Sequence, residues 1–440
     1  MGRDKIESSG DELPKKWYNI LSDLPEPLPP YISIRDGSEM RRLPNVFTKT
    51  ASDLEFSSKR WIDIPEEVRS AYLLSGRPRP LVRAHRLESY LKTPARIYYK
   101  CEDLSPVGSF KTNTALPQAY WAMKEGYERT VFASSLQTRT HFVHAHAARC
   151  FGLTPTIFIP GKYLNDNREQ ANFLKSMIGA EIVESPSTRT GYGRRSMGSI
   201  EDLNPIEVAR EEAVEEITQN NASIGVVSSF LNHVLLTQTI MGLEAERQMK
   251  FVEDDADVYI ASVGGGSSFF GLIAPFMGRC LKGGLKGARF LAVESETTSK
   301  LTDGSYKYVQ MQSPMSSILG KTYEVIKAPR HTIAGVGIQT SNTAPILGLL
   351  RNLGYIQTVV YPSDEKIVFE AARVFLRTEA SLIAPESAYA VAAAIEEAKR
   401  AKNARDDRVI LLSISAKSYM DFGEKQRYLH HDGDSRFTSS

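Results

Sequence analysis

The stretch Val258-Tyr259-Ile260-Ala261-Ser262-Val263-Gly264-Gly265-Gly266-Ser267-Ser268 decides the fold class, because an apolar strand runs directly into a glycine turn that opens an apolar helix. Three successive glycines remove the Cβ atoms that would hold a ligand away from the backbone. Amides at the start of a helix point outwards, and the helix dipole there favours an anion. The stretch therefore predicts a phosphate-binding turn. Without a ligand, the same pattern is only a tight connection between strand and helix.

Short apolar strands alternate with helical stretches on both sides of this turn. The expected strands are 96–100, 130–134, 156–159, 181–183, 257–263, 289–293 and 408–414. The expected helices are 111–125, 140–150, 167–178, 229–250 and 268–281. Such alternation is typical of βαβ units, which build parallel sheets. We therefore expect an α/β protein with two domains, parallel-rich sheets and a ligand in the cleft between them.

The length of the chain, 440 residues, is enough for two such domains. Residues 1–75 are rich in proline, with Pro-Glu-Pro-Leu-Pro-Pro at 25–30, and predict an extended arm over a larger body. We expect a smaller α/β domain at 76–225. The larger α/β domain, at 226–440, then carries the glycine turn.

Charge and cysteine content exclude several classes of protein. Lys and Arg number 54 against 52 Asp and Glu, so the net charge of +2 gives no field that would draw nucleic acid or a membrane. No apolar run reaches the roughly 20 residues that a bilayer span needs, and the N-terminus lacks the apolar segment of a signal peptide. Three widely spaced cysteines suggest neither a disulfide framework nor a metal site. We expect a protein of the reducing cytoplasm.

A lysine stands at the mouth of a predicted helix, in Gly108-Ser109-Phe110-Lys111-Thr112-Asn113. The positive end of the helix dipole repels a lysine there and lowers its pKa, which suits an amine that acts as a nucleophile and forms a Schiff base. Most lysines are simply exposed at the surface. Paired with a phosphate-binding turn in the other domain, however, Lys111 indicates pyridoxal phosphate, held by its phosphate at one end and its aldehyde at the other.

Several stretches, in order along nearly the whole chain, match one known family. They are 14–19, 23–29, 60–62, 76–78, 94–98, 231–236, 264–267 and Ala384-Pro385-Glu386-Ser387-Ala388. On these stretches the chain resembles the β subunit of tryptophan synthase, in the second, longer type that does not depend on the α subunit. The resemblance implies the fold-type II architecture of pyridoxal phosphate enzymes, a homodimer and an amino-acid substrate.

The resemblance also implies roles for single residues. Lys111 would form the Schiff base, Asn113 would lie near the ring oxygen of the cofactor, and Glu379 would lie in the wall of its pocket. The phosphate would be held by Gly264, Gly265, Gly266, Ser267 and Ser268. Ser415 would form a hydrogen bond with the pyridine nitrogen. A neutral hydroxyl there does not keep that nitrogen protonated, which favours loss of a group from the β-carbon over transamination.

The sequence departs from the family on the substrate side. Where the family has Glu-Thr-Gly-Ala-Gly-Gln, with a catalytic glutamate and a carboxylate-binding glycine turn, this chain has the substrate-loop residues Ser134, Ser135, Leu136, Gln137, Thr138, Arg139 and Thr140. A serine cannot supply the acid–base help, worth roughly 10²–10⁴-fold, that the glutamate gives. The Arg139 guanidinium could bind a carboxylate or a phosphate instead. Further changes occur at Phe110, 306–311, 335–340 and Ala416-Lys417.

His141 is the candidate for a replacement acid–base group, because it lies in the changed loop and imidazole titrates near neutral pH. His141, His144 and His146 do not make a plausible metal site, since 146 points away from the face that 141 and 144 share on a helix.

Three hypotheses for function follow. The first is a pyridoxal phosphate lyase or synthase that acts at the β-carbon of an amino acid, by elimination or replacement, on a non-standard substrate. The alternative is tryptophan synthase β activity, from L-serine or O-phosphoserine and indole. The last is a non-catalytic relative that keeps the fold. The sequence leaves open the amino-acid donor, the nucleophile, any regulating partner and any need for a monovalent cation.

Overall fold

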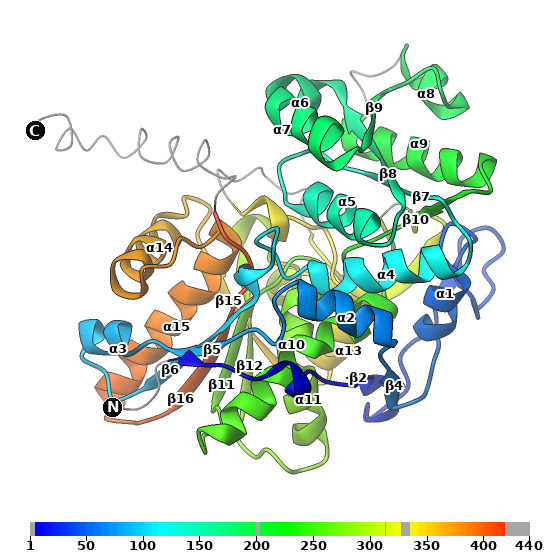
Figure 1. Cartoon of the computed structure of the whole chain (residues 1–440). Coiled ribbons are helices and arrows are strands. Elements are labelled where there is room, and N and C mark those ends of the chain that lie inside the picture. Colours follow the sequence, from blue (N-terminus) through cyan, green and yellow to red (C-terminus); the bar gives the residue numbers. More distant parts are fainter. Residues whose placement is uncertain (1–4, 199–202, 313, 327–334, 419–440) are drawn as a thin grey trace, which may run out of the picture.

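The larger unit of the protein is built around a seven-stranded sheet (Figure 1). The computed structural model describes residues 5–198, 203–312, 314–326 and 335–418. The order of the strands is β1 (Lys5–Ile6), β5 (Leu81–Arg83), β6 (Arg96–Cys101), β16 (Val409–Ile414), β11 (Val258–Ser262), β12 (Arg289–Ser295) and β15 (Ile356–Tyr361). From β6 to β15 all neighbours are parallel, whereas β5 and β1 add to the edge antiparallel.

Helices cover both faces of this sheet, as buried parallel strands require. Alternate side chains of β11 enter two different cores: Tyr259 and Ala261 join one, and Val258 and Ile260 join the other. The first core includes α10 (Asn232–Phe251) and α11 (Ser267–Leu281), and the second includes α3 (His85–Leu91), α14 (Lys366–Glu379) and α15 (Pro385–Ala404). Because both faces of β11 are buried, nearly all of its residues are apolar.

A second, smaller sheet has four parallel strands. Their order is β10 (Ser223–Gly225), β7 (Arg129–Ala133), β8 (Thr154–Pro160) and β9 (Glu181–Ser185). The helices of this unit are α5 (Thr140–Cys150), α6 (Gly161–Asp166), α7 (Arg168–Phe173), α8 (Gly191–Ser196) and α9 (Pro205–Gln219). Helix α4 (Thr112–Lys124) packs against α5 of the smaller unit and against α10 of the larger one, and so joins the two (Figure 1).

The expected α/β architecture with two parallel-rich sheets is confirmed, but its boundary is not at residue 76. Strands β5 and β6 pair within the seven-stranded sheet, β6 with β16 at the other end of the chain. The elements of the smaller sheet therefore begin only at β7, and 76–225 is not a single unit. No local pattern in the sequence reports that β6 and β16 pair.

Residues 5–74 contribute to the same core as the larger body. Strand β2 (Lys16–Tyr18) pairs with β4 (Trp61–Asp63), and β3 (Ile32–Ser33) joins β14 (Ile318–Glu324), which pairs with β13 (Ser305–Gln310). The remaining helices are α1 (Lys49–Glu55), α2 (Glu66–Leu74), α12 (Lys300–Asp303) and α13 (Pro345–Asn352). Glu55 accepts hydrogen bonds from the amides of Asn232 (2.8 Å) and His233 (3.0 Å), where its charge complements the start of α10.

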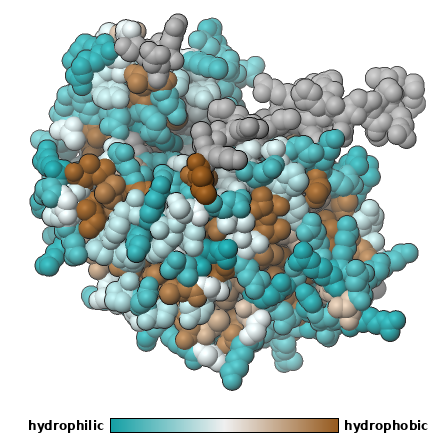
Figure 2. All heavy atoms as spheres, turned by 180° about the vertical axis from the view of Figure 1, so that it is seen from behind, coloured by the Kyte–Doolittle hydropathy of each residue, from teal (hydrophilic) through white to brown (hydrophobic). Residues whose placement is uncertain are grey.

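The surface opposite to the view of Figure 1 shows hydrophobic residues in separate groups among hydrophilic ones (Figure 2). Large apolar side chains that are strongly exposed include Leu74, Met177 and Phe251. None of the helices in the described ranges combines the length and the hydropathy that crossing a membrane requires.

Trp17 is expected to contribute strongly to stability. Its ring is 1% exposed and packs edge-on against Trp121 of α4, with ring centroids 6.4 Å apart. Trp17→Ala should lower the free energy of unfolding by about 3–5 kcal/mol, through lost burial and a residual cavity. Trp61→Ala, on the paired strand but 46% exposed, is the control in denaturant unfolding. Equal losses of unfolding free energy in both variants would contradict the packing of the N-terminal residues 5–74 into the core of the larger body.

Candidate active site

A cavity of about 1210 Å³ is lined by residues of both units. It lies where three parallel strands end, because the segments that follow β7, β11 and β16 all contribute to its wall. This is the usual position of ligands in open α/β sheets. The lining includes Lys111, 134–135, 137–140, His144, 264–268, Glu386 and Ser415.

The glycine turn leaves no room for side chains. A Cβ on Gly264 would lie 2.7 Å from the carbonyl oxygen of Gly337, and one on Gly265 would overlap the hydroxyl of Ser229. Gly266, the residue before α11, has a φ of 103°, in the left-handed region that glycine tolerates. The buried Ser268 Oγ has no hydrogen-bond partner among the residues that the structure describes. Backbone amides, a helix start and an unused hydroxyl together fit a phosphate group.

Lys111 lies directly before α4, and its Nζ donates a hydrogen bond to Thr140 Oγ1 at 2.7 Å. Burial lowers the pKa of Lys111 to about 8; Glu386 opposes this shift, and Arg139 adds to it. The amine is therefore much more often unprotonated near neutral pH than an ordinary lysine, as a nucleophile must be. The sequence predicted this direction from the helix dipole, but the main cause is burial.

Ser415 follows β16 and lines the cavity next to Lys111. Its carbonyl oxygen accepts a hydrogen bond from the Phe110 amide at 2.9 Å, so the residue before the lysine is paired to the end of the large sheet. The Ser415 hydroxyl lies 3.0 Å from that of Ser387. It can therefore offer a neutral hydrogen bond and no charge to a ligand.

The changed loop brings hydroxyls and a cation to the cavity but no carboxylate. All of its residues line the cavity except Leu136, which is buried in the core of the smaller unit with a φ of 58°. Ser134 Oγ accepts a hydrogen bond from the Leu136 amide at 3.1 Å. Thr138 Oγ1 donates to Thr140 Oγ1 at 3.0 Å. Arg139 is largely buried, directly before α5.

The structure contradicts the prediction that His141 is a replacement acid–base group. His141 is completely buried and is not part of the cavity lining; its Nδ1 lies 3.3 Å from Ser134 Oγ. Burial lowers the pKa of His141 to about 3, so the ring is neutral at physiological pH. His144 does line the cavity, with Nε2 2.7 Å from Ser228 Oγ. Burial, and then the charge of Lys111, lower its pKa to about 3 as well.

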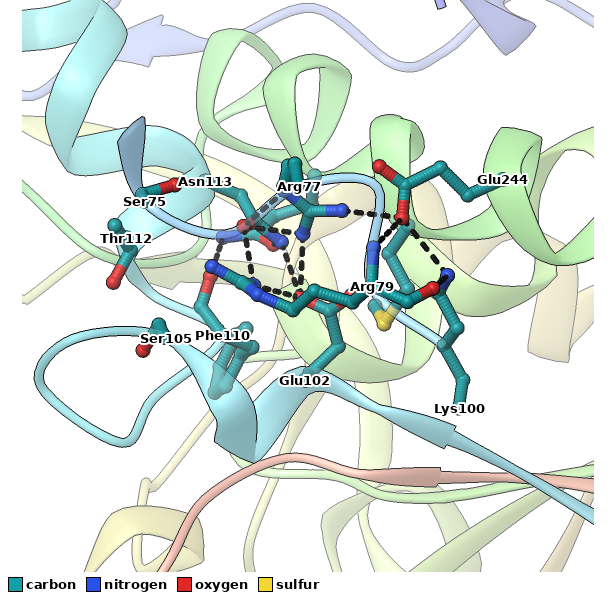
Figure 3. Close-up of polar contacts among 12 residues, drawn as sticks. Ser75, Arg77, Arg79, Lys100, Glu102, Ser105, Phe110, Thr112, Asn113 and Glu244 are labelled. Carbon is teal, nitrogen blue, oxygen red and sulfur yellow. Dashed lines mark hydrogen bonds and ion pairs between the residues drawn. The ribbon is translucent and has the colours of Figure 1, made fainter. Parts of the chain in front are cut away.

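Asn113 and Glu379 also lie elsewhere than the resemblance implied. The Asn113 side chain turns away from the cavity into a buried ion cluster (Figure 3). Glu379, at the end of α14, accepts a hydrogen bond from the Leu87 amide at 2.8 Å and so caps α3. A resemblance in sequence gives the position of a residue but not the direction in which its side chain points.

Glu386 is a carboxylate of the cavity that the sequence analysis did not single out. It lies in the first turn of α15, where Oε1 accepts a hydrogen bond from the Gly337 amide at 2.8 Å. Oε2 is buried and has no hydrogen-bond partner among the described residues. The sequence does contain a pattern that indicates Glu386. It is an acidic residue that follows Pro385 at the start of a helix, inside one of the stretches shared with the family.

Comparisons with known proteins agree with this geometry. The family described as "Pyridoxal-phosphate dependent enzyme" matches residues 72–415. The chain is 39% identical to tryptophan synthase beta chain 2 of Aquifex aeolicus, over 97% of this chain and 98% of that protein. It is 40% identical to tryptophan synthase beta chain 2 of Thermococcus kodakarensis, over 95% of this chain and 94% of that protein. The chain belongs to the tryptophan synthase β-chain family.

Solved structures of two threonine deaminases share the fold. The threonine deaminase of T.th. has a TM-score of 0.55 at 21% identity, and the match covers 80% of this chain and 97% of its own. Isoform 2 of Solanum lycopersicum, in its processed form, has a TM-score of 0.59 at 16% identity, covering 84% of this chain and 94% of its own. These likenesses, together with the family, confirm the fold-type II architecture.

Members of this family are enzymes that use pyridoxal phosphate, so the hypothesis of a non-catalytic relative is dropped. The cavity fits that cofactor, since the glycine turn forms a cradle that a phosphate group suits and Lys111 has the amine for its aldehyde. When bound, the cofactor withdraws electrons from the Cα of an amino acid joined to it, which allows a group on Cβ to leave.

Gly265→Ala should weaken binding of pyridoxal phosphate by about tenfold or more, because the added methyl group overlaps Ser229 and pushes a ligand off the amides. Gly284→Ala is the control. It lies in the turn after α11, where the nearest atom to a new Cβ is 3.5 Å away. Titration of the apoenzyme with cofactor measures the dissociation constants. Unchanged affinity in Gly265→Ala would contradict the assignment of the glycine turn as the site that binds the phosphate of the cofactor.

The Lys111 amine should titrate well below the range of an ordinary lysine. Because its pKa is about 8 against 10.5, its unprotonated fraction, and so its rate of acylation in the apoenzyme, should rise most steeply between about pH 7 and 9. Peptide mass spectrometry after brief acetylation measures this rate. In the denatured chain the same lysine should return to its ordinary range near 10.4. A folded-state midpoint in that range would contradict the burial argument.

Proposed function

We propose that this enzyme replaces an anionic leaving group on the β-carbon of an amino acid, and that it makes L-tryptophan from O-phospho-L-serine and indole. The observation that carries the proposal is a loop beside Lys111 that presents Arg139 and no carboxylate to the cavity. The names of the related proteins support tryptophan synthesis over a different product.

The leaving group is the part of the reaction that the changed loop affects. A hydroxyl group leaves only with the help of an acid, whereas phosphate leaves as an anion. Around the loop, His141 and His144 are neutral at physiological pH, and an arginine does not release its proton. The guanidinium of Arg139 can instead form paired hydrogen bonds with phosphate oxygens.

The chain's other residues have roles that suit this reaction. With a pKa of about 8, Lys111 can both take up and release a proton near neutral pH, and Thr140 holds its Nζ on the loop side of the cavity. Two carboxylates line the described part of the cavity, Glu207 and Glu386. Glu207 pairs with Arg210, which leaves Glu386 as the carboxylate beside the lysine.

A second candidate is replacement or elimination with a partner other than indole, the first hypothesis drawn from the sequence. The cavity has polar lining that an indole ring does not need, namely Lys162, Asn204, Glu207, Arg210 and Gln312. A polar nucleophile would use these groups.

Assembly follows the family in this proposal. The relatives carry the name beta chain 2, and we infer that the enzyme works on a small amino acid without an α subunit. The homodimer and the cytoplasmic location stay predictions. The state of assembly can be measured by light scattering of the purified holoenzyme.

Tryptophan formation from indole should proceed with a kcat/KM about 10²-fold or more higher for O-phospho-L-serine than for L-serine, because only the hydroxyl group needs the missing acid. Steady-state assays with each donor at constant indole measure this ratio. Comparable values for the two donors would contradict the proposal. Consumption of O-phosphoserine with release of a keto acid, and no tryptophan, would favour the second candidate.

Two variants separate the contributions of the loop. Arg139→Met should raise KM for O-phospho-L-serine far more than for L-serine, since it removes the cation that binds phosphate. Ser134→Glu, which restores the carboxylate of the family, should shift the preference back towards L-serine.

A further inference from the structure

A buried ion cluster lies against the first turn of α4 (Figure 3). Its members are Arg77, Arg79, Lys100, Glu102, Asn113 and Glu244. Every one of these side chains is buried. The cavity lining includes none of them, so neither the cofactor nor the proposed substrate accounts for the cluster.

Glu102 and Arg79 of the cluster stay ionised across the physiological pH range, whereas burial lowers the pKa of Lys100. Burial alone would raise the pKa of Glu102, but the charges of Arg77, Arg79 and Lys100 outweigh it and lower that pKa to about 2. Burial lowers the pKa of Arg79 to about 10, which still leaves it charged. Buried ion pairs are weak contributors to stability, because the charges must be taken out of water. Their other attested use is to specify one geometry.

The contacts of the cluster converge on Asn113. Its Oδ1 accepts hydrogen bonds from Arg77 (Nε at 3.2 Å, a terminal nitrogen at 2.5 Å) and from Arg79 at 3.2 Å. Its Nδ2 donates to Glu102 Oε2 at 2.9 Å and to Gln238 Oε1 at 3.0 Å. Both donor hydrogens of the amide are therefore used within the cluster and on α10.

The backbone on either side of Lys111 is held by Tyr72 and by Gln238, the residue of α10 that also binds Asn113. The carbonyl oxygen of Asn113 accepts a hydrogen bond from the Tyr72 hydroxyl at 2.5 Å. Gln238 Nε2 donates to the carbonyl oxygen of Phe110 at 3.4 Å. Lys111 itself makes no side-chain capping bond to the helix it precedes, so these contacts fix the start of α4 from outside.

The same helix α10 also fixes the other end of the cofactor site. It packs against α11 so closely that a Cβ on Gly242 would lie 2.6 Å from the carbonyl oxygen of Gly271. A Cβ on Gly271 would in turn lie 2.8 Å from the Cβ of Gln238. Since α11 begins at the glycine turn, Gln238 is connected to the phosphate cradle through α11 and to Lys111 through Asn113.

We propose that the cluster sets the separation between Lys111 and the phosphate cradle, with Arg77, Arg79, Glu102 and Asn113 as positioning residues for the lysine. A ligand held at both ends needs these two points at a fixed distance, and displacements of about 1 Å at a catalytic group can cost about 10²-fold in rate. The inference rests on Lys111 as the cofactor lysine. It does not depend on which amino acid or nucleophile the enzyme uses.

The test uses Asn113→Ala in the full-length apoenzyme, with two ligands. Inorganic phosphate can bind at the cradle or at Arg139 without a bond to Lys111, whereas pyridoxal phosphate needs the cradle and Lys111 together. Asn113→Ala should leave the affinity for phosphate unchanged and weaken pyridoxal phosphate about tenfold. Because the lysine would also gain contact with water, its midpoint of acetylation should rise by about one pH unit, which slows its acetylation at pH 8 about fivefold.

Trp121→Leu is the matched control on the same helix, because Trp121 is buried against Trp17 and His233, outside the cluster and the cavity lining. It should lower stability without changing either measurement on Lys111. Arg77→Lys keeps the charge but loses the paired contact with Asn113. If Asn113→Ala does not fold, this variant should show the same pattern in weaker form. A loss of stability with wild-type lysine titration and cofactor affinity in both cluster variants would overturn the proposal.

Discussion

The contact between α10 and α11 is the constraint on which the rest of the cavity depends. Glycines at 242 and 271 let the two backbones approach to a distance at which no side chain fits between them. This contact fixes the start of α11, and with it the glycine turn, relative to the middle of α10. The arm reinforces the arrangement, since the carboxylate of Glu55 caps the start of α10. The shape of the cofactor site therefore depends on close backbone packing at Gly242 and Gly271, which lie outside the cavity lining.

The sequence was sufficient for those parts of the site that a local pattern encodes. An apolar strand, three glycines and an apolar helix have essentially one way to fold, and so the turn before α11 could be predicted from the residues alone. Lys111 was found in the same way, by its place before a helix. Asn113 could have been excluded as a cavity residue on the same grounds, because two residues along a helix correspond to about 200° of rotation and thus to the opposite face.

Other parts depended on contacts between distant segments. Strand β6 pairs with β16, more than three hundred residues later in the chain, and the residues of neither strand indicate with which strand it pairs. The complete burial of His141 depends on how α5 packs against the smaller sheet. Glu379 and Glu386 are the same residue type only seven positions apart. Glu379 is the last residue of α14, and Glu386 lies in the first turn of α15. Only the assembled fold shows which of them faces the cavity.

Arg139 links the two proposals about the substrate and the lysine. Its charge is one of the causes that lower the pKa of Lys111, whereas Glu386 acts in the opposite direction. A phosphate bound at Arg139 would cancel that contribution and add negative charge of its own, so the pKa of Lys111 would rise when the donor is in place. The amine would then be a stronger base for the proton on Cα at the moment the substrate is present. An uncharged donor such as L-serine would not produce this change. A loop that carries the Arg139 cation and lacks the family's glutamate can therefore favour an anionic donor twice, through its leaving group and through the basicity of the lysine.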